Sequence, residues 1–144
     1  MKSNRQNTIL LIDDDSLFLK LTMKILRDAG YRDYPAQGND SALAILERHS
    51  DNIGLIVQDC QRPYGRCLGG DTRREEGDSG IRFLREILRQ RYPSIPVIFM
   101  TGDWSISKMP NLNALFLIQP FKIEELKNIV SFCFQFCGHE LGDE

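Results

Sequence analysis

Apolar residues gather in four short runs along the chain, and a fifth, weaker run accompanies them. The four runs are 9–12, 53–57, 96–100 and 115–118, and the weaker one is 33–37. Short runs that are apolar at every position are typical of strands buried on both faces of a parallel sheet. Pro35 cannot donate a ladder hydrogen bond, so we expect the strand that contains it at the sheet edge.

Segments with helical periodicity alternate with these runs. The spacing predicts helices over 16–29, 40–49, 79–92 and 122–136. Between 101 and 115 the helical signal is poor, because Pro110 interrupts a short segment. Alternation of strand and helix predicts a parallel sheet that is covered by helices on both faces.

The same periodicity predicts which side chains face inward. We expect Leu17, Leu21 and Ile25 to share the apolar face of the first helix. Ser79 is expected to be the N-cap of the third helix. In the last helix, the residues expected to face inward are Ile123, Leu126, Val130 and Cys133.

Length and composition predict a single domain, 1–144, with its core at about 8–136. The net charge of -2 and a hydrophobic content of 42% give no indication of nucleic-acid or membrane binding. No apolar run is long enough to span a bilayer, and residues 1–7 lack the apolar core of a signal peptide. We therefore expect a cytoplasmic location, and in that reducing compartment the four cysteines are expected to be free thiols.

Carboxylates follow two of the predicted strands. Asp13, Asp14 and Asp15 come directly after the first strand, and Asp59 ends the third. The carboxyl ends of adjacent parallel strands meet at one edge of the sheet, so Asp13, Asp14 and Asp59 are expected to converge. Clustered carboxylates repel one another and usually indicate a bound cation. The alternative is that Asp13 and Asp14 only interact with the dipole of the helix that follows.

Taken together, these motifs resemble the receiver domain of two-component response regulators, from Thr8 to about Phe136. Each motif alone is weak, but all of them occur in order and at strand ends. The resemblance implies a flavodoxin-like, doubly wound α/β fold with a five-stranded parallel sheet of order 2-1-3-4-5. The matching positions are Asp13 and Asp14 for the acidic pair, Asp59 four residues before Pro63 for the phosphoacceptor, Thr101 for the hydroxyl residue, and Phe116 for the aromatic switch.

The resemblance also implies a function. Asp59 would take a phosphoryl group from a histidine kinase or a histidine phosphotransfer protein. Such a domain receives a group and is not an enzyme, beyond slow self-dephosphorylation at most. The implied cofactor is Mg²⁺, which neutralises charge during phosphoryl transfer. Its direct ligands would be Asp14, Asp59 and the backbone carbonyl of Gln61, with Asp13 acting through water.

The chain departs from the receiver pattern at the end of the last strand. Gln119 stands where the family usually carries a Lys, and a Gln side chain has no charge to bridge a phosphoryl oxygen. The resemblance implies that the bond from Gln119 to Pro120 is cis.

A second departure is an insertion over about 64–79, rich in glycine and mixed charge. We expect it to be a mobile loop that is not needed for folding. Its arginines are expected to be solvated, with the alternative that one of them substitutes for the missing Lys; the arginines in and beside the segment are Arg62, Arg66, Arg73 and Arg74.

Two further functions are kept as alternatives. A pseudo-receiver that is never phosphorylated would act only by contact with other proteins, and Gln119 favours this hypothesis. A hydrolytic enzyme with Asp59 as nucleophile is less well supported, because the sequence offers no separate general acid. Phe132, Phe134 and Phe136 widen the apolar arc of the last helix, either for core packing or for contact with a partner or a second copy in a homodimer.

Overall fold

The computed structural model describes residues 7–60, 62–63, 65–69, 75–76 and 78–137. Five parallel strands form one sheet in the order β2-β1-β3-β6-β7. This confirms the flavodoxin-like order 2-1-3-4-5. Pro35 lies in the edge strand, opposite Leu11, as its missing N–H predicts. The strands are β1 (Thr8–Ile12), β2 (Arg32–Ala36), β3 (Leu55–Asp59), β6 (Val97–Thr101) and β7 (Leu115–Ile118).

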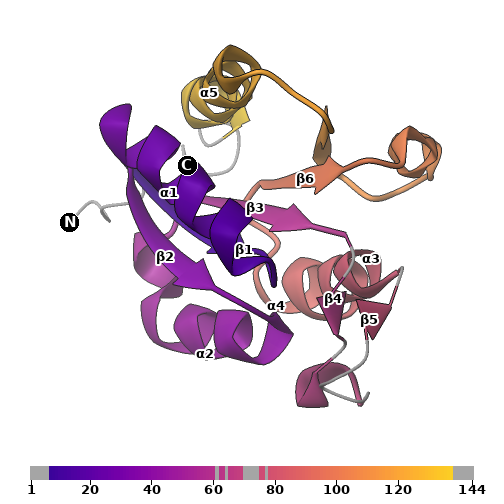
Figure 1. Ribbon diagram of the computed structural model, residues 1–144. Helices are drawn as coiled ribbons and strands as arrows, with labels where there is room; N and C mark the ends of the chain where they lie inside the picture. The colour runs from indigo at the N-terminus through magenta and orange to yellow at the C-terminus, as the bar shows by residue number, and fades with distance from the viewer. Residues whose placement is uncertain (1–6, 61, 64, 70–74, 77, 138–144) are drawn as a thin grey trace.

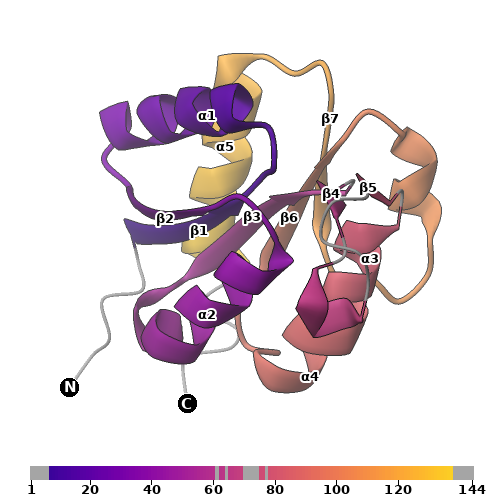
Figure 2. The ribbon, with the colours of Figure 1, turned by 60° about the horizontal axis from the view of Figure 1, so that its bottom comes forward.

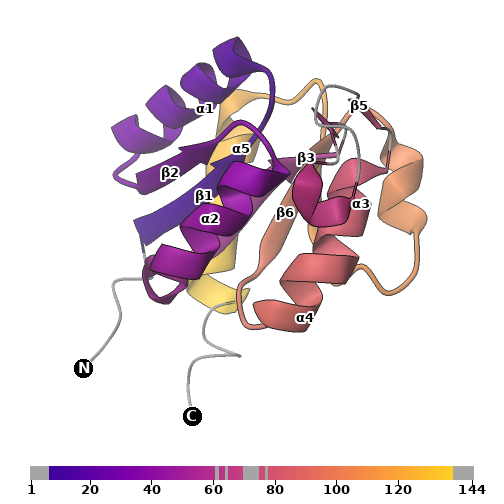
Figure 3. The same cartoon turned by 90° about the horizontal axis from the view of Figure 1, so that it is seen from below.

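Helices cover both faces of this sheet (Figures 1, 2 and 3). On one face lie α1 (Ser16–Asp28) and α5 (Ile123–Phe132), which continues into the π-helical turn η6 (Cys133–Cys137). On the other face lie α2 (Asn39–His49) and a helical stretch over 79–91. In the described part of the chain, no helix is long and apolar enough to cross a membrane.

Several shorter helical elements connect the strands. The stretch over 79–91 consists of α3 (Ser79–Phe83), a π-helical turn η4 (Leu84–Leu88) and α4 (Arg89–Arg91). The 3-10 turn η2 (Ser50–Asn52) follows α2. Between β6 and β7 the structure has only the five-residue 3-10 turn η5 (Trp104–Lys108), which agrees with the poor helical signal before Pro110.

Alternating strand residues divide the core into two layers. Leu10 and Ile12 pack toward α2, whereas Ile9 and Leu11 pack toward α1 and α5. All four are at most 1% exposed, and burial of such a side chain contributes about 1.5–3 kcal/mol. The four cysteines are free thiols, as the sequence predicts.

Helix α1 buries a different face from the one that the sequence predicts. Leu19, Thr22 and Leu26 are buried against the sheet, whereas Leu17 is 77% and Leu21 is 52% exposed. The prediction of the inward face was therefore wrong for Leu17 and Leu21. Apolar residues occur on more than one side of this helix, so periodicity alone did not decide which side meets the sheet.

Two expectations at helix starts also need correction. Ser79 is the first residue of α3, not its N-cap, and its buried Oγ accepts a hydrogen bond from Asn39 Nδ2 at 3.0 Å. Asp78 precedes the helix instead. In α5, Ile123 is 54% exposed, because it lies in the first turn. The other three residues predicted to face inward are buried: Leu126, Val130 and Cys133.

The aromatic residues near the end of α5 divide between core and surface. Phe134 is half-buried and stacks on Tyr31, with ring centroids 5.3 Å apart. Phe132 and Phe136 are 47% and 55% exposed, and their ring centroids lie 5.0 Å apart. Core packing therefore explains Phe134, and the two exposed rings form a small apolar surface.

The insertion after β3 is partly built into the fold. Strand β4 (Arg62–Pro63) pairs antiparallel with β5 (Glu75–Glu76) beside α3 (Figures 1 and 3). The 3-10 turn η3 (Arg66–Leu68) packs on α2, and Leu68 is only 7% exposed. These described parts differ from the expected mobile loop, because a buried Leu and paired backbone groups hold them. Arg73 and Arg74 lie outside the described residues.

The carboxylate of Asp40, in α2, holds the N-terminal end of η3. Both carboxylate oxygens of Asp40 accept backbone N–H bonds, one from Arg66 and one from Cys67, each at 2.8 Å. Burial alone would raise the pKa of Asp40, but these two bonds, together with the Cys67 side chain and the charge of Arg66, hold the pKa below its usual value. A side chain at Gly65 would meet the same carboxylate at 2.9 Å, and the backbone there has a φ of +76°. Glycine is therefore required at the point where the chain turns onto α2.

Candidate functional site

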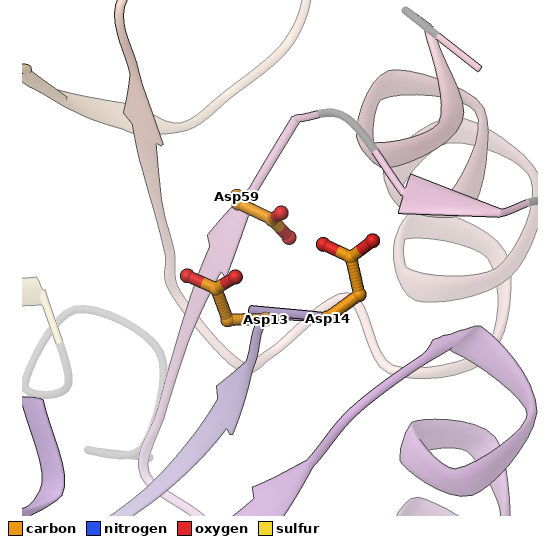
Figure 4. Close-up of side chains that lie close together, drawn as sticks. All are labelled: Asp13, Asp14 and Asp59. Carbon is orange, nitrogen blue, oxygen red and sulfur yellow. The ribbon is translucent and has the colours of Figure 1, made fainter. Parts of the chain in front are cut away.

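Three carboxylates meet at the carboxyl edge of the sheet. Ile12 pairs with Gln58 across β1 and β3, so the next residues, Asp13 and Asp59, emerge side by side. Asp14 follows directly, and one oxygen from each of the three lies within 4.8 Å of the others. Figure 4 shows the side chains turned toward one another from the ends of the two strands. The predicted convergence of Asp13, Asp14 and Asp59 is present.

These carboxylates line an open cleft of about 560 Å³. Thr101, at the end of β6, and Gln119, just after β7, belong to its lining as well. Their backbones are joined, because Gln119 N donates to the carbonyl of Thr101 at 2.7 Å. The Gln119–Pro120 bond is cis, as expected. The side chains predicted to hold the metal or to act in phosphoryl transfer therefore border one cleft, namely Asp13, Asp14, Asp59, Thr101 and Gln119.

The three successive aspartates have different roles. Asp15 is the N-cap of α1 and accepts the N–H bonds of Leu17 and Phe18 at 3.1 Å each. Asp13 Oδ1 accepts the N–H of Asp15 at 2.9 Å, which fixes the Asp13 carboxylate at the cleft. Helix capping therefore explains why an aspartate stands at position 15. It does not explain why Asp13 and Asp14 face Asp59.

The electrostatics of the cluster favour a cation. Burial raises the pKa of Asp59 to about 7, with Arg62 opposing and Asp13 and Asp14 adding to the rise. Burial also raises the pKa of Asp13 to about 6, against the N–H bond from Asp15. A divalent cation would relieve both effects, because it favours the ionised carboxylates.

The donor set fits the ion that the resemblance implies. All three side chains offer carboxylate oxygens, which are the ligands that Mg²⁺ prefers, and the open cleft leaves space for its waters. Asp13, Asp14 and Asp59 would hold the ion. Gln61, expected to add its backbone carbonyl, lies outside the described residues.

Arg62 contacts the candidate phosphoacceptor directly. Its side chain is 0% exposed, and Nη1 donates to Asp59 Oδ1 at 3.0 Å and to the backbone carbonyl of the same residue. Nη2 donates to Gln58 Oε1, and Nε donates to Asn39 Oδ1. The guanidinium carbon lies 5.4 Å from the ring centroid of Phe83. The prediction that Arg62 is a solvated charge was therefore wrong.

Signals for this buried arginine were present in the sequence. Gln58 is a polar residue directly after the apolar run 53–57, and Asn39 follows Gly38 at a predicted helix start. Both side chains are buried in the structure, where they accept hydrogen bonds from Arg62. Polar residues at two buried positions indicate a buried donor between them, because unpaired polar groups are costly. Arg66, in contrast, is exposed as predicted.

Thr101 lies on the other wall of the cleft, whereas Phe116, which the resemblance also singles out, packs against the core and does not line the cleft. The Oγ1 of Thr101, which is 5% exposed, accepts the N–H of Asp103 at 3.0 Å. Asp103 in turn caps η5 through Ser105 N at 3.0 Å. Phe116 is half-buried and stacks on Phe99, with ring centroids 5.7 Å apart. Thr101 and Phe116 thus lie on the neighbouring strands β6 and β7.

The sheet order and the acidic cleft define a receiver-type α/β domain. The chain belongs to the response regulator receiver domain family, whose model matches residues 9–131. This confirms the family that the motifs resemble.

Relatives come from bacteria and plants. The chemotaxis protein CheY of Pseudomonas aeruginosa is 25% identical over 133 residues, which are 88% of this chain and 95% of CheY. The two-component response regulator ARR14 of Arabidopsis thaliana is 30% identical over 84% of this chain and 29% of its own length. The response regulator-like PRR37 of Oryza sativa subsp. indica is 27% identical over 93% of this chain. This chain spans only 17% of the length of PRR37.

Solved structures agree with the fold. The receiver domain of NtrX from Brucella abortus superposes with a TM-score of 0.69 at 26% identity, covering 89% of this chain and 98% of that one. The signal receiver domain of an HD domain-containing protein from Pseudomonas fluorescens Pf-5 gives a TM-score of 0.74 at 22% identity. That superposition covers 100% of this chain and 97% of the other.

Proposed function

We propose that this receiver domain relays a phosphorelay signal in the cytoplasm by accepting a phosphoryl group on Asp59. The observation that carries the proposal is the convergence of Asp13, Asp14 and Asp59 in one cleft with Thr101 and Gln119. In the transfer, a carboxylate oxygen of Asp59 attacks the phosphorus of a phosphohistidine. A bond from phosphorus to oxygen forms, the bond from phosphorus to nitrogen breaks, and its electron pair stays on the imidazole.

Five residues of the cleft have a role in this step. Asp13, Asp14 and Asp59 would hold Mg²⁺, which when bound neutralises the charge that accumulates on the phosphoryl oxygens. The Thr101 hydroxyl can donate a hydrogen bond to the phosphoryl group. Gln119 can donate from its amide, but it brings no positive charge.

The phosphoryl donor that fits this chemistry is a histidine kinase or a histidine phosphotransfer protein. The autoinducer sensor kinase/phosphatase CqsS of Vibrio cholerae is 29% identical over 102 residues. The receiver domain of the hybrid histidine kinase CckA superposes with a TM-score of 0.67 at 25% identity. Both support a donor from the histidine kinase class. In this role the chain is a phosphoryl acceptor, with at most slow self-dephosphorylation, and not an enzyme.

Acetyl phosphate and Mg²⁺ provide a direct test. Intact-mass spectrometry should show one added phosphoryl group on the wild-type chain, lost on acid or hydroxylamine treatment. Asp59→Asn should abolish the addition. Asp28→Asn is the matched control, because Asp28 is an exposed aspartate of α1 that pairs with Lys24 on the surface, and it should leave the addition unchanged. A wild-type chain that gains no mass in Mg²⁺ would contradict the proposal.

A pseudo-receiver that acts by contact alone is the second candidate. Arg62 already binds one oxygen of Asp59, and Gln119 lacks the usual charge, which favours a domain that is never phosphorylated. The exposed rings of Phe132 and Phe136 would then serve as a contact surface for a partner or for a second copy. This candidate predicts no added mass, together with partner binding that Asp59→Asn leaves unchanged.

A further inference from the structure

We propose that Arg62 is a positioning residue that couples the chemical state of Asp59 to the starts of α2 and α3 and to the base of the insertion. This inference rests on the proposed function and specifies where phosphorylation is transmitted. The structural change that follows phosphorylation would then occur on the insertion side of β3, and not at Thr101 and Phe116.

Arg62 determines which oxygen of Asp59 is open to the phosphoryl group. Arg62 Nη1 binds Oδ1 of Asp59 at 3.0 Å and also the backbone carbonyl of that residue, so the carboxylate is held against rotation. This assigns the incoming phosphoryl group to the other oxygen, Oδ2. Among the described residues that line the cleft there is no Lys or Arg, so Arg62 is the cation that directly contacts the acceptor.

Phosphoryl transfer changes the charge on the oxygen that Arg62 contacts. Before transfer, Oδ1 belongs to a carboxylate and shares its negative charge. After transfer it is the carbonyl oxygen of an acyl phosphate, and the charge lies on the phosphoryl oxygens. The charge-assisted hydrogen bond from Arg62 therefore becomes a weaker one to a neutral acceptor. A fully buried guanidinium that loses its counter-charge is costly, so Arg62 must shift toward the phosphoryl group or toward its other partners.

Hydrogen bonds connect Arg62 to elements outside the cleft. Nε of Arg62 binds Oδ1 of Asn39, the first residue of α2, whose Nδ2 binds Ser79 Oγ at 3.0 Å. Ser79 begins α3, and the next residue, Gly80, donates its N–H to the carbonyl of Cys60 at 2.8 Å. Arg62 is itself part of β4 at the base of the insertion. A shift of the Arg62 side chain would therefore affect α2, α3 and β4.

An unpaired donor in the same network supports two arrangements. Gln58 Nε2 is buried and has no hydrogen-bond partner among the described residues, although Oε1 of the same side chain binds Arg62. A buried donor without a partner costs about 1–3 kcal/mol. A shift of Arg62 gives this amide an opportunity to re-pair, which favours a second arrangement once Asp59 is modified.

Beryllofluoride with Mg²⁺, a mimic of the phosphoryl group, tests the coupling. Fluorine NMR reports whether the mimic is bound, and ¹H–¹⁵N spectra report the response of the Asn39 side-chain amide and of the Gly80 backbone amide. In the wild type we expect both amides to shift on binding. In Arg62→Met we expect binding to persist and these shifts to fall to less than about one third. Arg66→Met, an exposed arginine four residues further on, is the matched control and should respond like the wild type.

A second variant keeps the test decisive if Arg62→Met does not fold. Ser79→Ala removes the acceptor of Asn39 Nδ2 and leaves the contact between Arg62 and Asp59 in place. In this variant the Arg62 Nε signal should still move on binding, whereas the Gly80 shift should be lost.

The outcomes separate the two proposals. No bound beryllofluoride in the wild type would overturn the proposed function, and this inference with it. Bound beryllofluoride without a shift at Asn39 and Gly80 would overturn the inference alone. An undiminished Gly80 shift in Arg62→Met or Ser79→Ala would do the same.

Discussion

Gly80 lies directly against the backbone of Asp59. A Cβ atom at position 80 would lie 2.6 Å from the carbonyl oxygen of Asp59 and 2.8 Å from Cα of Cys60. Real Cβ atoms do not approach backbone so closely, and neither neighbour is a flexible side chain that could turn away. The start of α3 and the end of β3 therefore form one tightly packed unit, and the candidate phosphoacceptor is held from the insertion side as well as from the sheet.

Gly80→Ala should consequently disturb both stability and the site. We expect it to lower the free energy of unfolding by about 1–3 kcal/mol, the usual cost of forcing extra volume into a packed interior. It should also weaken beryllofluoride binding, because Asp59 must move to accommodate the methyl group. Urea unfolding and fluorine NMR measure the two effects. Gly38→Ala is the control, since a Cβ there meets nothing within 4 Å; equal losses in both variants would contradict this account.

Stability should depend on pH in a direction set by Asp59. Its pKa is raised to about 7 in the folded chain, so the folded state keeps a proton that the unfolded chain releases at lower pH. Without metal, the free energy of unfolding should therefore fall as the pH rises from about 4 to about 7. Asp13, whose pKa is raised to about 6, adds to the same trend.

Mg²⁺ should reverse this loss, because it binds the ionised carboxylates and stabilises the folded state by mass action. Urea unfolding across this pH range, with chelator or with millimolar Mg²⁺, measures both trends. Asp59→Asn should flatten the metal-free trend and reduce the gain from Mg²⁺. The expectation fails if Mg²⁺ stabilises the wild type no more at high pH than at low pH.

Asp40 should hold the η3 segment on α2. Asp40→Ala removes the acceptor of the Arg66 and Cys67 amides, and amide hydrogen exchange at both positions should accelerate. Because Asp40 is largely exposed, we expect a loss of only about 1 kcal/mol in the free energy of unfolding. Glu47→Ala, which removes a surface ion pair with Arg91, is the control and should leave both amides unchanged. Unaltered exchange in Asp40→Ala would show that Leu68 alone fixes the segment.

Gln119→Lys should strengthen the response to the phosphoryl mimic at Thr101 and Phe116. A Lys there would place a cation beside the phosphoryl group, and a charge pair at ~4 Å is worth on the order of 4 kcal/mol at an effective dielectric of 20, before desolvation. A neutral hydrogen bond from Gln contributes about 1 kcal/mol. We expect tighter beryllofluoride binding and larger NMR shifts at Thr101 and Phe116 in the variant.

Gln90→Lys makes the same chemical change on the exposed face of α4, away from the cleft, and serves as the control. An equal response of Gln119→Lys and the wild type at Thr101 and Phe116 would contradict this prediction. It would indicate that Arg62 already supplies the positive charge that the response requires.

The fold was predictable from the sequence because its signals are local and redundant. Four apolar runs and Pro35 fix the strands and the edge, and strand ends that carry Asp13 and Asp59 fix where the site must lie. The inward face of α1 was not predictable in the same way. Leu17 and Leu21 are as apolar as Leu19 and Leu26, so the choice between them depends on how the helix packs against the sheet.

The residues that line the cleft were predicted from the sequence, but the contact of Arg62 with Asp59 was not. Asp13, Asp14, Thr101 and Gln119 border the cleft as expected, because each lies at a strand end. Arg62 was missed because arginine is rarely buried, and a charged residue beside a glycine-rich segment is usually solvated. Its burial depends on partners that are distant in sequence, such as Asn39, and only the packing of α2 against the insertion brings them together.

The short ladder between β4 and β5 has a practical consequence. It pairs Pro63 with Glu75, so the two ends of the intervening segment are fastened to each other beside α3. Added length between 69 and 75 should then cost little, since loop-closure entropy grows slowly with length, and Arg62 need not move. A fluorescent module grafted at that point would turn the domain into a sensor that reports on the state of Asp59 from outside the cleft.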